Sequence, residues 1–389
     1  MSIVPQRMFY YWNHFPFEDC CRWLSYGNGY ILSLREVSFG ISDGMFFRNL
    51  SFNNALDFKL NARRINPERI DLGPVYNISP ALAVIEQSKS LFKQSVTQRE
   101  VVFDIDISDY EEVRTCCIGS NLCRKCWKYM AIACKVIDLA LREDFGYCHI
   151  LWTYSGGRGV HCWVCDEEAR KLKPAEREAV GDYLQIIKSG AFNVKKVHFE
   201  KVPHPSVKRA LQIIEPEFVK TCVEEQNILG TEEGMQIFLR MISSLCNSET
   251  VKEDLKEIFD TLETSGQRWK AFLDFFKKTN EWRTVFVAEE LMIQYFYPRL
   301  DIGVTKVLNH LLKCPFSPHN KTQKICIPFD VEKVDDFDPT TAPNIPSLFA
   351  ETQLEKAGET NLPALTKFRE GVQVFQKFVS KLEKYKCYA

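Results

Sequence analysis

The stretch Glu100–Tyr110, EVVFDIDISDY, has the composition of a buried strand but carries three aspartates. Its Val, Phe and Ile residues favour a β-strand with an apolar face. Because side chains alternate along a strand, Asp104 and Asp106 project from the same face, about 7 Å apart. Asp109 falls on the other parity or in the following turn, and we interpret it as structural. Unpaired carboxylates beside an apolar face are costly to desolvate, so Asp104 and Asp106 require compensating charges.

A pair of divalent cations would supply those charges. Two carboxylates at this spacing suit metals roughly 3.5 to 4 Å apart, as in two-metal phosphoryl-transfer sites. The alternative is an exposed strand with solvated aspartates, which a short Asp-x-Asp pattern does not exclude. Far downstream, Asp301 lies between apolar residues, as Asp104 does, and could complete a three-carboxylate site.

The composition indicates a packed globular protein. The chain has 389 residues, of which 45% are hydrophobic and 13% aromatic, which argues against disorder. Its formal net charge is -1, so no global basic field drives binding to nucleic acid, and any site for a polyanion must be local.

The fifteen cysteines do not indicate a secreted disulfide scaffold, because the chain is large and its start, MSIVPQRMFYYWNHF, lacks a charged segment followed by an apolar one. We expect an intracellular, reducing compartment. No window reaches about 18 uninterrupted apolar residues, so we also expect a soluble protein without a membrane span.

Sequence periodicity predicts a mixed α/β fold. The strand after Glu100 is followed by a cysteine-bearing loop, a helix over residues 128–146 and a hairpin around 155–159. Charged helical patterns dominate residues 191–290, and strand character returns near 295–306.

We predict a catalytic domain over 1–190 plus 291–335, a helical subdomain over 191–290, and a linker with a C-terminal helix over 336–389. That helix has one apolar face, formed by Leu365, Phe368, Val372, Phe375, Val379 and Leu382.

The segment Ser155–Val164, SGGRGVHCWV, is suited to binding phosphate. Its glycines allow a tight turn that brings backbone N–H groups close to an anion, and Arg158 and His161 add side-chain donors. The alternative is an ordinary glycine-rich hairpin with a packed histidine. Downstream, Lys313 and His319 could also neutralise phosphate, although a lone histidine is more often satisfied by packing.

Four cysteines gather in RTCCIGSNLCRKCW, at Cys116, Cys117, Cys123 and Cys126. A C-x2-C knuckle with a second nearby pair is typical of a zinc site, and four thiolates leave no open position, so we predict a structural ion. Because adjacent cysteines form an unusual knuckle, three cysteines with another ligand remain an alternative. We expect the other eleven cysteines to be small buried hydrophobes.

Taken together, these motifs resemble the small, catalytic subunit of eukaryotic and archaeal DNA primase. The matching segments are FDIDxxDYxxVR with CC-x5-C-x2-C, SGxRGVHCWVCD, and RLDxxVxxxxNHLLKxPFSxH, in the family's order. CRWLSYG, REVSF, RNLSFNN and NPERIDLGPVY extend the resemblance, which covers residues 8–340 and is closer to the eukaryotic form. It implies the primase fold of mixed β-sheets flanked by helices, with a zinc-binding loop and a helical insertion.

The resemblance also implies site residues. The ligands of two catalytic Mg²⁺ or Mn²⁺ ions would be Asp104, Asp106 and Asp301. The residues binding the nucleotide would be Glu36, Arg48, Arg69, Asp71, Ser155, Arg158, His161, Lys313 and His319. One structural Zn²⁺ would be held by Cys116, Cys117, Cys123 and Cys126.

The implied activity is DNA-directed synthesis of short RNA primers from nucleoside triphosphates on single-stranded DNA, in replication. The implied partners are a large subunit with an iron-sulfur domain and the replicative DNA polymerase alpha complex, and the implied location is the nucleus. One alternative is a primase-polymerase or repair-type polymerase of the same superfamily. Another is a non-catalytic zinc module that binds nucleic acid, in which the basic run Val194–Arg209 could contact phosphate, although a solvated face is the commoner role of such a run.

One position departs from the family pattern. The eukaryotic motif reads SGRRGVH, whereas this chain has Gly157 in place of the first arginine. We therefore predict weaker nucleotide binding than a Gly157→Arg variant would show.

Overall fold

The computed structural model describes residues 2–86, 94–188, 199, 203–278 and 286–384. It divides into two compact units. The first comprises Met1–Asp104, Gly146–Gly181 and Asp301–Ala389, and the second comprises Ile105–Phe145 and Asp182–Leu300. Half of the basic run Val194–Arg209 lies outside the described residues.

The first unit contains a five-stranded sheet in the order β10-β3-β1-β2, with β4 paired to β3. Its strands are β1 (Arg35–Gly40), β2 (Phe46–Leu50), β3 (Arg69–Tyr76), β4 (Val96–Gln98) and β10 (Leu312–Lys313). The strand pairs described in this sheet are all antiparallel. Strand β1 is buried along its whole length, which places it in the core.

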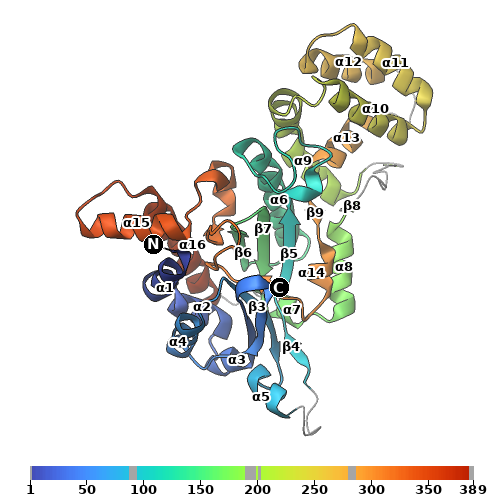
Figure 1. Cartoon of the computed structure of the whole chain (residues 1–389). Helices are drawn as coiled ribbons and strands as arrows, with labels where there is room; N and C mark the ends of the chain where they lie inside the picture. The colour runs from blue at the N-terminus through green and yellow to red at the C-terminus, as the bar shows by residue number, and fades with distance from the viewer. Residues whose placement is uncertain (1, 87–93, 189–198, 200–202, 279–285, 385–389) are drawn as a thin grey trace. The chain divides into compact units, whose positions relative to one another are not determined.

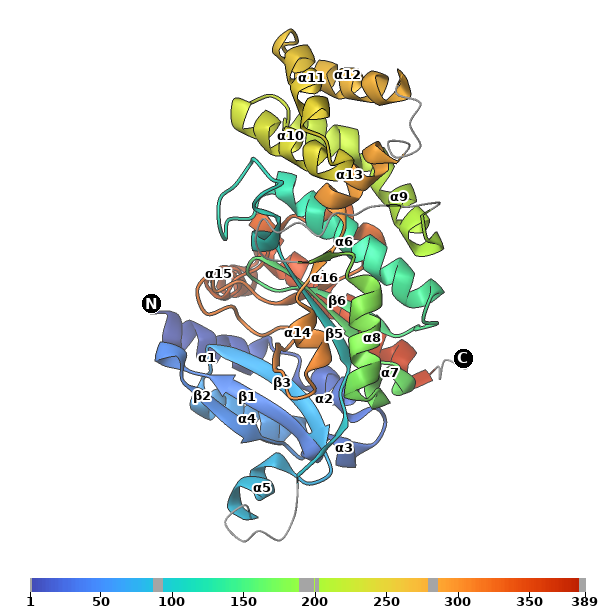
Figure 2. The ribbon, with the colours of Figure 1, turned by 90° about the vertical axis from the view of Figure 1, so that its right-hand side faces the viewer.

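Five helices belong to the same part of the chain: α1 (Ile3–Asn13), α2 (Phe17–Ser25), α3 (Gly29–Leu34), α4 (Ala55–Ile65) and α5 (Pro80–Glu86). Figure 2 shows the blue strands β1, β2 and β3 beside α1, α2 and α4. The contact between β1 and α4 is aromatic, because the rings of Phe39, Phe52 and Phe58 are stacked. The aromatic-rich N-terminal segment forms two helices, because the chain breaks around Pro16, which has no N–H to continue a helix.

A second sheet has the order β11-β6-β7-β5. Its strands are β5 (Val101–Asp106), β6 (Ile150–Tyr154), β7 (Gly159–Val164) and β11 (Ile327–Phe329). Strand β5 confirms the predicted alternation, since Phe103 and Ile105 are buried while Asp104 and Asp106 are half-buried. The predicted hairpin is β6 and β7, in antiparallel register with Thr153 opposite His161. Strand β7 is followed by the short helix α7 (Glu167–Lys171) and the longer α8 (Pro174–Leu184), and the short helix α14 (Ile302–Lys306) precedes β10.

The C-terminal region is more ordered than the predicted linker. Within it, α15 (Ile345–Lys356) begins at Asn344, whose side chain accepts a hydrogen bond from Ser347 N in a capping box. The predicted C-terminal helix is α16 (Pro363–Lys384), and the predicted apolar face buries Leu365, Phe368, Phe375 and Val379. Helix α16 packs against β11 and α2, so this region belongs to the first unit (Figure 1).

The second unit is mainly helical, as the sequence predicts for the described part of 191–290. Its helices are α6 (Arg124–Glu143), α9 (Pro205–Phe218), the π-helical turn Val219–Glu225, α10 (Glu232–Cys246), α11 (Glu249–Asp260), α12 (Ser265–Lys278) and α13 (Val287–Phe296). A two-stranded parallel sheet pairs β8 (Ile187–Lys188) with β9 (Arg299–Leu300). The aromatic core of the second unit is formed by the rings of Phe218, Phe238, Trp269 and Phe272.

The mixed α/β fold with helix-flanked antiparallel sheets is therefore confirmed. The predicted domain boundaries at 190 and 291 fall inside the second unit, which also takes in Ile105–Phe145, and that division stays a prediction. Within the described ranges, no helix combines the length and apolar character needed to cross a membrane.

Candidate active site and metal centre

Asp104 and Asp301 lie next to each other although 196 positions separate them in the sequence. The backbone N–H of Asp301 donates to the carbonyl oxygen of Asp104 at 3.2 Å. Thr305 in α14 donates its hydroxyl to Val102 O at 2.7 Å, which fastens the same segment to β5. The Asp301 carboxylate caps α14 by accepting from Gly303 N at 3.1 Å, and it is exposed to solvent. Backbone contacts thus bring together two of the three residues predicted to bind metal.

The third predicted ligand, Asp106, belongs to the second unit. Its carboxylate accepts hydrogen bonds from the backbone N–H and hydroxyl of Ser108, both at 2.8 Å, and caps the 3-10 turn Ile107–Tyr110. It follows Asp104 by two residues on β5, so the strand places both carboxylates on one side. The role of all three carboxylates as metal ligands stays a prediction.

The glycine-rich loop between β6 and β7 is held by Ser155. Its hydroxyl oxygen accepts from the N–H groups of Gly157 and Gly159, each at 3.2 Å. Gly156 has φ +75, and a Cβ there would lie 2.7 Å from the carbonyl oxygen of Lys324, so only glycine fits. Ser155 therefore shapes the predicted phosphate loop from within.

Two basic side chains from the first sheet adjoin this loop. The buried Lys313 donates its ammonium to Ser155 O at 2.8 Å, and β10 pairs it with Asp71 on β3. Arg69, also on β3, donates to the Asp71 carboxylate at 2.6 Å. Burial lowers the pKa of Lys313 to about 8, and the charge of Arg69 acts in the same direction. The same burial raises the pKa of Asp71, against the opposing effect of Arg69 and Lys313.

Two histidines complete what we call the cationic cluster, which consists of Arg69, Arg158, His161, Lys313 and His319. His161 is buried on β7, with Nε2 at 3.7 Å from the Asp104 carboxylate. Burial, followed by the charges of Lys313 and Arg69, lowers the pKa of His161 well below its usual value. Burial and then Lys313, Arg69 and Arg158 lower the pKa of His319 to about 3.

The lowered pKa values of His161 and His319 share one electrostatic cause besides burial. Several positive charges converge around two histidines that stay neutral near pH 7, and such a field attracts an anion. Nδ1 of His161 is buried without a hydrogen-bond partner among the described residues. Nδ1 of His319 accepts from Thr322 N at 3.2 Å, which leaves its Nε2 to carry the proton.

Glu36 and Arg48 form a separate pair on the same sheet. The buried Glu36 carboxylate accepts from Arg48 at 2.9 Å and from the hydroxyl of Tyr76 at 3.1 Å. The Arg48 side chain stays about half exposed, at 48%. Strand β1 lies beside β3, where Ser38 is opposite Asp71, so the pair and Asp71 share one sheet.

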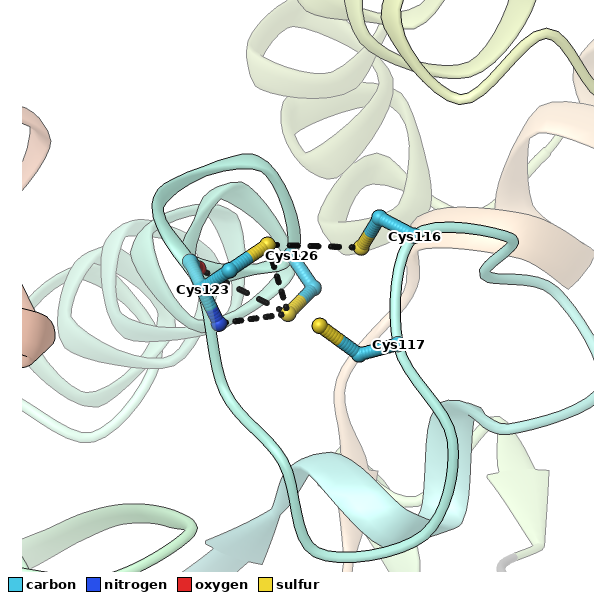
Figure 3. A group of neighbouring side chains, drawn as sticks. All are labelled: Cys116, Cys117, Cys123 and Cys126. Carbon is cyan, nitrogen blue, oxygen red and sulfur yellow. Dashed lines mark hydrogen bonds between the residues drawn. The ribbon is translucent and has the colours of Figure 1, made fainter.

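The four predicted cysteine ligands gather at the start of α6 in the second unit (Figure 3). Their sulfur atoms all lie within 4.8 Å of one another. Cys123 Sγ is 3.6 Å from Cys116 Sγ and 3.7 Å from Cys126 Sγ. A tetrahedron with metal–sulfur bonds of about 2.3 Å has edges of about 3.8 Å, so the four thiols fit a tetrahedral metal ion.

Neighbouring side chains hold this cluster. Gln226 donates to Cys116 Sγ at 3.3 Å and accepts from the N–H groups of Thr115 and Cys116. Arg114 donates to the carbonyl oxygens of Asn121 and Gly119, which closes the loop between the two cysteine pairs. Such supporting contacts orient metal ligands before an ion binds.

Several residues near these sites were not singled out from the sequence. Tyr76 and Gln226 support Glu36 and Cys116, but single residues of these types carry no pattern. The pKa of His310 is lowered by burial and then by Arg99, while Asp301 opposes that shift, so this histidine also lies near the acidic site. His310 lies in the NHLLK segment of the family motif, and this position could have indicated it from the sequence.

Two other residues of the segment that matches RLDxxVxxxxNHLLKxPFSxH are structural. Ser317 accepts from Ile70 N at 2.8 Å and joins the chain to β3. Arg299 is buried and forms an ion pair with Glu112 at 2.6 Å. Most of the other described cysteines are buried thiols, as expected, but Cys246 is half-buried and Cys148 is exposed, and Cys387 lies outside the described residues.

Comparison with known families identifies the chain. The model of the DNA primase small subunit family matches residues 103–331, which contain both the cysteine cluster and the three aspartates. The chain belongs to the DNA primase small subunit family.

Curated members of the family match over most of their length. The DNA primase small subunit of Drosophila melanogaster is 38% identical over 96% of this chain and 90% of that protein. The DNA primase small subunit of Saccharomyces cerevisiae is 33% identical over 97% of this chain and 91% of that protein. The DNA primase small subunit of the archaeon Picrophilus torridus is 23% identical over 82% of this chain. The greater similarity to eukaryotic members agrees with the predicted resemblance.

Proposed function

We propose that this chain is the catalytic subunit of a DNA primase. It is a nucleotidyltransferase that makes short RNA primers on single-stranded DNA for replication. The observation that carries this proposal is the proximity of Asp104 to the cationic cluster, since His161 Nε2 lies 3.7 Å from its carboxylate. Nucleotidyl transfer needs acidic metal ligands and anion-binding groups side by side.

Asp104, Asp106 and Asp301 are proposed to hold two Mg²⁺ or Mn²⁺ ions. Carboxylate oxygens are the ligands that these hard cations prefer, and the Asp104 side chain keeps 35% of its surface accessible. When bound, the ions lower the pKa of the attacking 3′-hydroxyl and neutralise the charge that develops on the phosphates.

The cationic cluster is proposed to bind the triphosphate of the incoming nucleotide. Lys313 supplies a positive charge, and the neutral histidines donate N–H groups to phosphate oxygens. Arg158 and Arg69 add charge as pyrophosphate leaves, so the cluster stabilises negative charge at the leaving group. Ser155 acts by shaping the loop, because its oxygen already accepts two backbone N–H groups.

Glu36, Arg48 and Asp71 are proposed to line the same nucleotide site. Each is already held by a neighbour on the sheet, which sets its orientation before a nucleotide arrives. Because these side chains are oriented before the substrate binds, the entropic cost of positioning the substrate is lower.

The cysteine cluster is proposed to hold one structural Zn²⁺. Zinc favours tetrahedral thiolate coordination, and four protein ligands leave no open position for substrate. The ion would join the loop carrying Cys116 and Cys117 to the first turn of α6.

We further propose assembly with a primase large subunit that contains an iron-sulfur domain and with the DNA polymerase alpha complex, in the nucleus. These proposals come from the family and from the eukaryotic character of the motifs.

The decisive experiment is primer synthesis on a homopolymer DNA template with labelled ribonucleotide, with and without Mn²⁺. The wild type is expected to make short RNA, and Asp104→Asn is expected to make none while keeping its melting temperature. Asp109→Asn, in the same segment, is the matched control and should retain synthesis. Full activity of Asp104→Asn would contradict the assignment, and a preference for deoxynucleotides would favour the primase-polymerase alternative.

A further inference from the structure

Helices α1 and α4 expose an apolar surface that the proposed reaction does not use. In α1, Val4, Met8 and Trp12 are 49%, 41% and 46% exposed. In α4, Leu56 and Leu60 are 63% and 48% exposed. The spacing of four residues places each set on one face of its helix. We call these five side chains the α1–α4 patch.

The two sets adjoin because α1 and α4 pack against each other, and the contacts at the two ends of α1 show that the helices run antiparallel. Asn66, which ends α4, donates to Val4 O near the start of α1 at 3.1 Å. Near the other end of α1, the indole of Trp12 contacts α4, with Arg63 at 4.1 Å and Lys59 at 4.7 Å from the ring centroid.

The patch is not part of the core. The inward faces of these helices already bury Tyr10 and Tyr11 from α1 and Ala55, Phe58 and Ala62 from α4. Folding of the two helices therefore does not require apolar side chains on their outer faces. Contiguous exposed apolar surface of this kind marks an interaction site.

The charges beside the patch are positive. Lys59 and Arg63 lie over Trp12, and Arg64 is exposed on the same helix. The acidic residue of α4, Asp57, is turned to its own helix start, where it accepts from Asn53 N and Asn61 Nδ2. A complementary partner must offer apolar side chains flanked by carboxylates.

We propose that the α1–α4 patch binds an acidic amphipathic helix of a partner protein. Trp12 is the central anchor, because large aromatic side chains dominate binding energy, and Lys59 and Arg63 pair with acidic residues at the edge of the helix.

Other occupants fit the patch less well. A second copy of this chain, bound through the same patch, would bring Lys59 and Arg63 close to their own counterparts and create like-charge repulsion. A nucleic-acid base stacking on Trp12 would compete with the two cations over the indole, and four aliphatic side chains have no counterpart in a polyanion.

The test uses the full chain and a labelled synthetic helix of about 18 residues, with Leu at i, i+3, i+4, i+7 and i+11 and mainly Glu elsewhere. Binding is measured by fluorescence anisotropy against a scrambled peptide of the same composition and against a version with Lys in place of Glu. The wild type is expected to bind the acidic helix in preference to both, and more weakly as salt increases.

Variants of the patch then separate its two contributions. Trp12→Ala is expected to weaken binding by about tenfold or more. The double variant Lys59→Glu and Arg63→Glu is expected to lose the acidic helix and to acquire binding of the Lys version. Leu354→Ala, at a similarly exposed leucine of α15, is the matched control and should bind as the wild type does. Melting temperatures establish that each variant is folded.

Several results would overturn the proposal. These are equal binding of the scrambled peptide, no exchange of charge preference in the double variant, or wild-type affinity in Trp12→Ala. Self-association, binding of oligothymidylate or binding of anionic lipid vesicles that Trp12→Ala abolishes, without binding of the acidic helix, would assign the patch to another occupant. Primer synthesis in the same variants is expected to be unchanged, so failure of this test leaves the proposed function intact.

Discussion

The cysteine cluster and the cationic cluster are assembled over very different distances along the chain. Four sulfur ligands come from residues 116–126, on one loop and one helix turn. The cationic cluster takes residues from β3, the β6–β7 hairpin, β10 and the loop after it, between positions 69 and 319. The cysteine cluster therefore depends on a short local segment, whereas the cationic cluster depends on the register of strands that are far apart in the sequence.

Because the two clusters are assembled over different distances along the chain, they depend on different parts of the fold. The cysteine cluster needs its loop, its helix and an ion. The cationic cluster needs two sheets in register, because a shift of one residue turns every side chain to the opposite face. Substitutions in and beside the two sites test this contrast.

The carboxylates should matter for chemistry far more than for folding. Asp301→Asn keeps an oxygen that can accept from Gly303 N, so α14 retains its cap. Loss of a metal ligand removes several kcal/mol of transition-state stabilisation, which corresponds to about a thousandfold or greater loss of primer synthesis. Synthesis rates and melting temperature are measured together. A large fall in melting temperature with little loss of rate would make Asp301 a structural residue.

Substitution in the cysteine cluster should affect folding more than chemistry. Cys123→Ser is expected to remove the bound metal and to destabilise the second unit, since metal binding contributes directly to folding. Metal content and proteolysis of the second unit provide the measurements. Cys246→Ser, at a half-buried cysteine outside the cluster, is the control and should keep its metal. Full metal content in Cys123→Ser would support the alternative of three cysteines with another ligand.

Nucleotide binding should depend on pH through Lys313. Burial lowers the pKa of its ammonium to about 8, and a triphosphate favours the protonated form. Affinity should therefore fall as the pH rises through 8, by about tenfold between pH 7 and pH 9. Equilibrium binding of a ribonucleoside triphosphate at fixed metal concentration measures this. Lys313→Arg should flatten the profile, because arginine keeps its proton, and an unchanged profile in that variant would exclude Lys313 as the titrating group.

The smallest effect concerns Gly157. The sequence predicts that Gly157→Arg strengthens nucleotide binding, but a Cβ at this position would lie 2.7 Å from Nε2 of His319. The ring must move before an arginine fits, so we expect a change of only a few fold in the single variant. In a His319→Ala background, Gly157→Arg should increase affinity more clearly. Equal effects in both backgrounds would show that His319 does not limit this position.

Much of the fold could be predicted because its patterns are local. Strand β5, the β6–β7 hairpin and helix α16 were recognisable from alternation, glycines and an apolar stripe. The break between α1 and α2 and the presence of α15 were missed. Pro16 and the cap at Asn344 determine those boundaries, and a predominantly aromatic or acidic composition conceals them.

The candidate site was predicted residue by residue, but its connections were not. The motif resemblance pointed to Asp301 and Lys313 without showing what holds them. The backbone bond from Asp301 to Asp104, the contact of Lys313 with Ser155 and the place of His319 beside Gly157 appear only in the folded chain.

The ligand types, the cysteine cluster and the family could be predicted from the amino-acid sequence alone. These depend on residue identity and short spacing, which a chain carries before it folds. The tertiary structure sets which charges converge on the histidines, the backbone contact between Asp104 and Asp301, and the exposed position of Trp12 beside Lys59 and Arg63. Electrostatic fields and exposed surfaces depend on distances between residues far apart in sequence, and packing of the sheets and helices sets those distances.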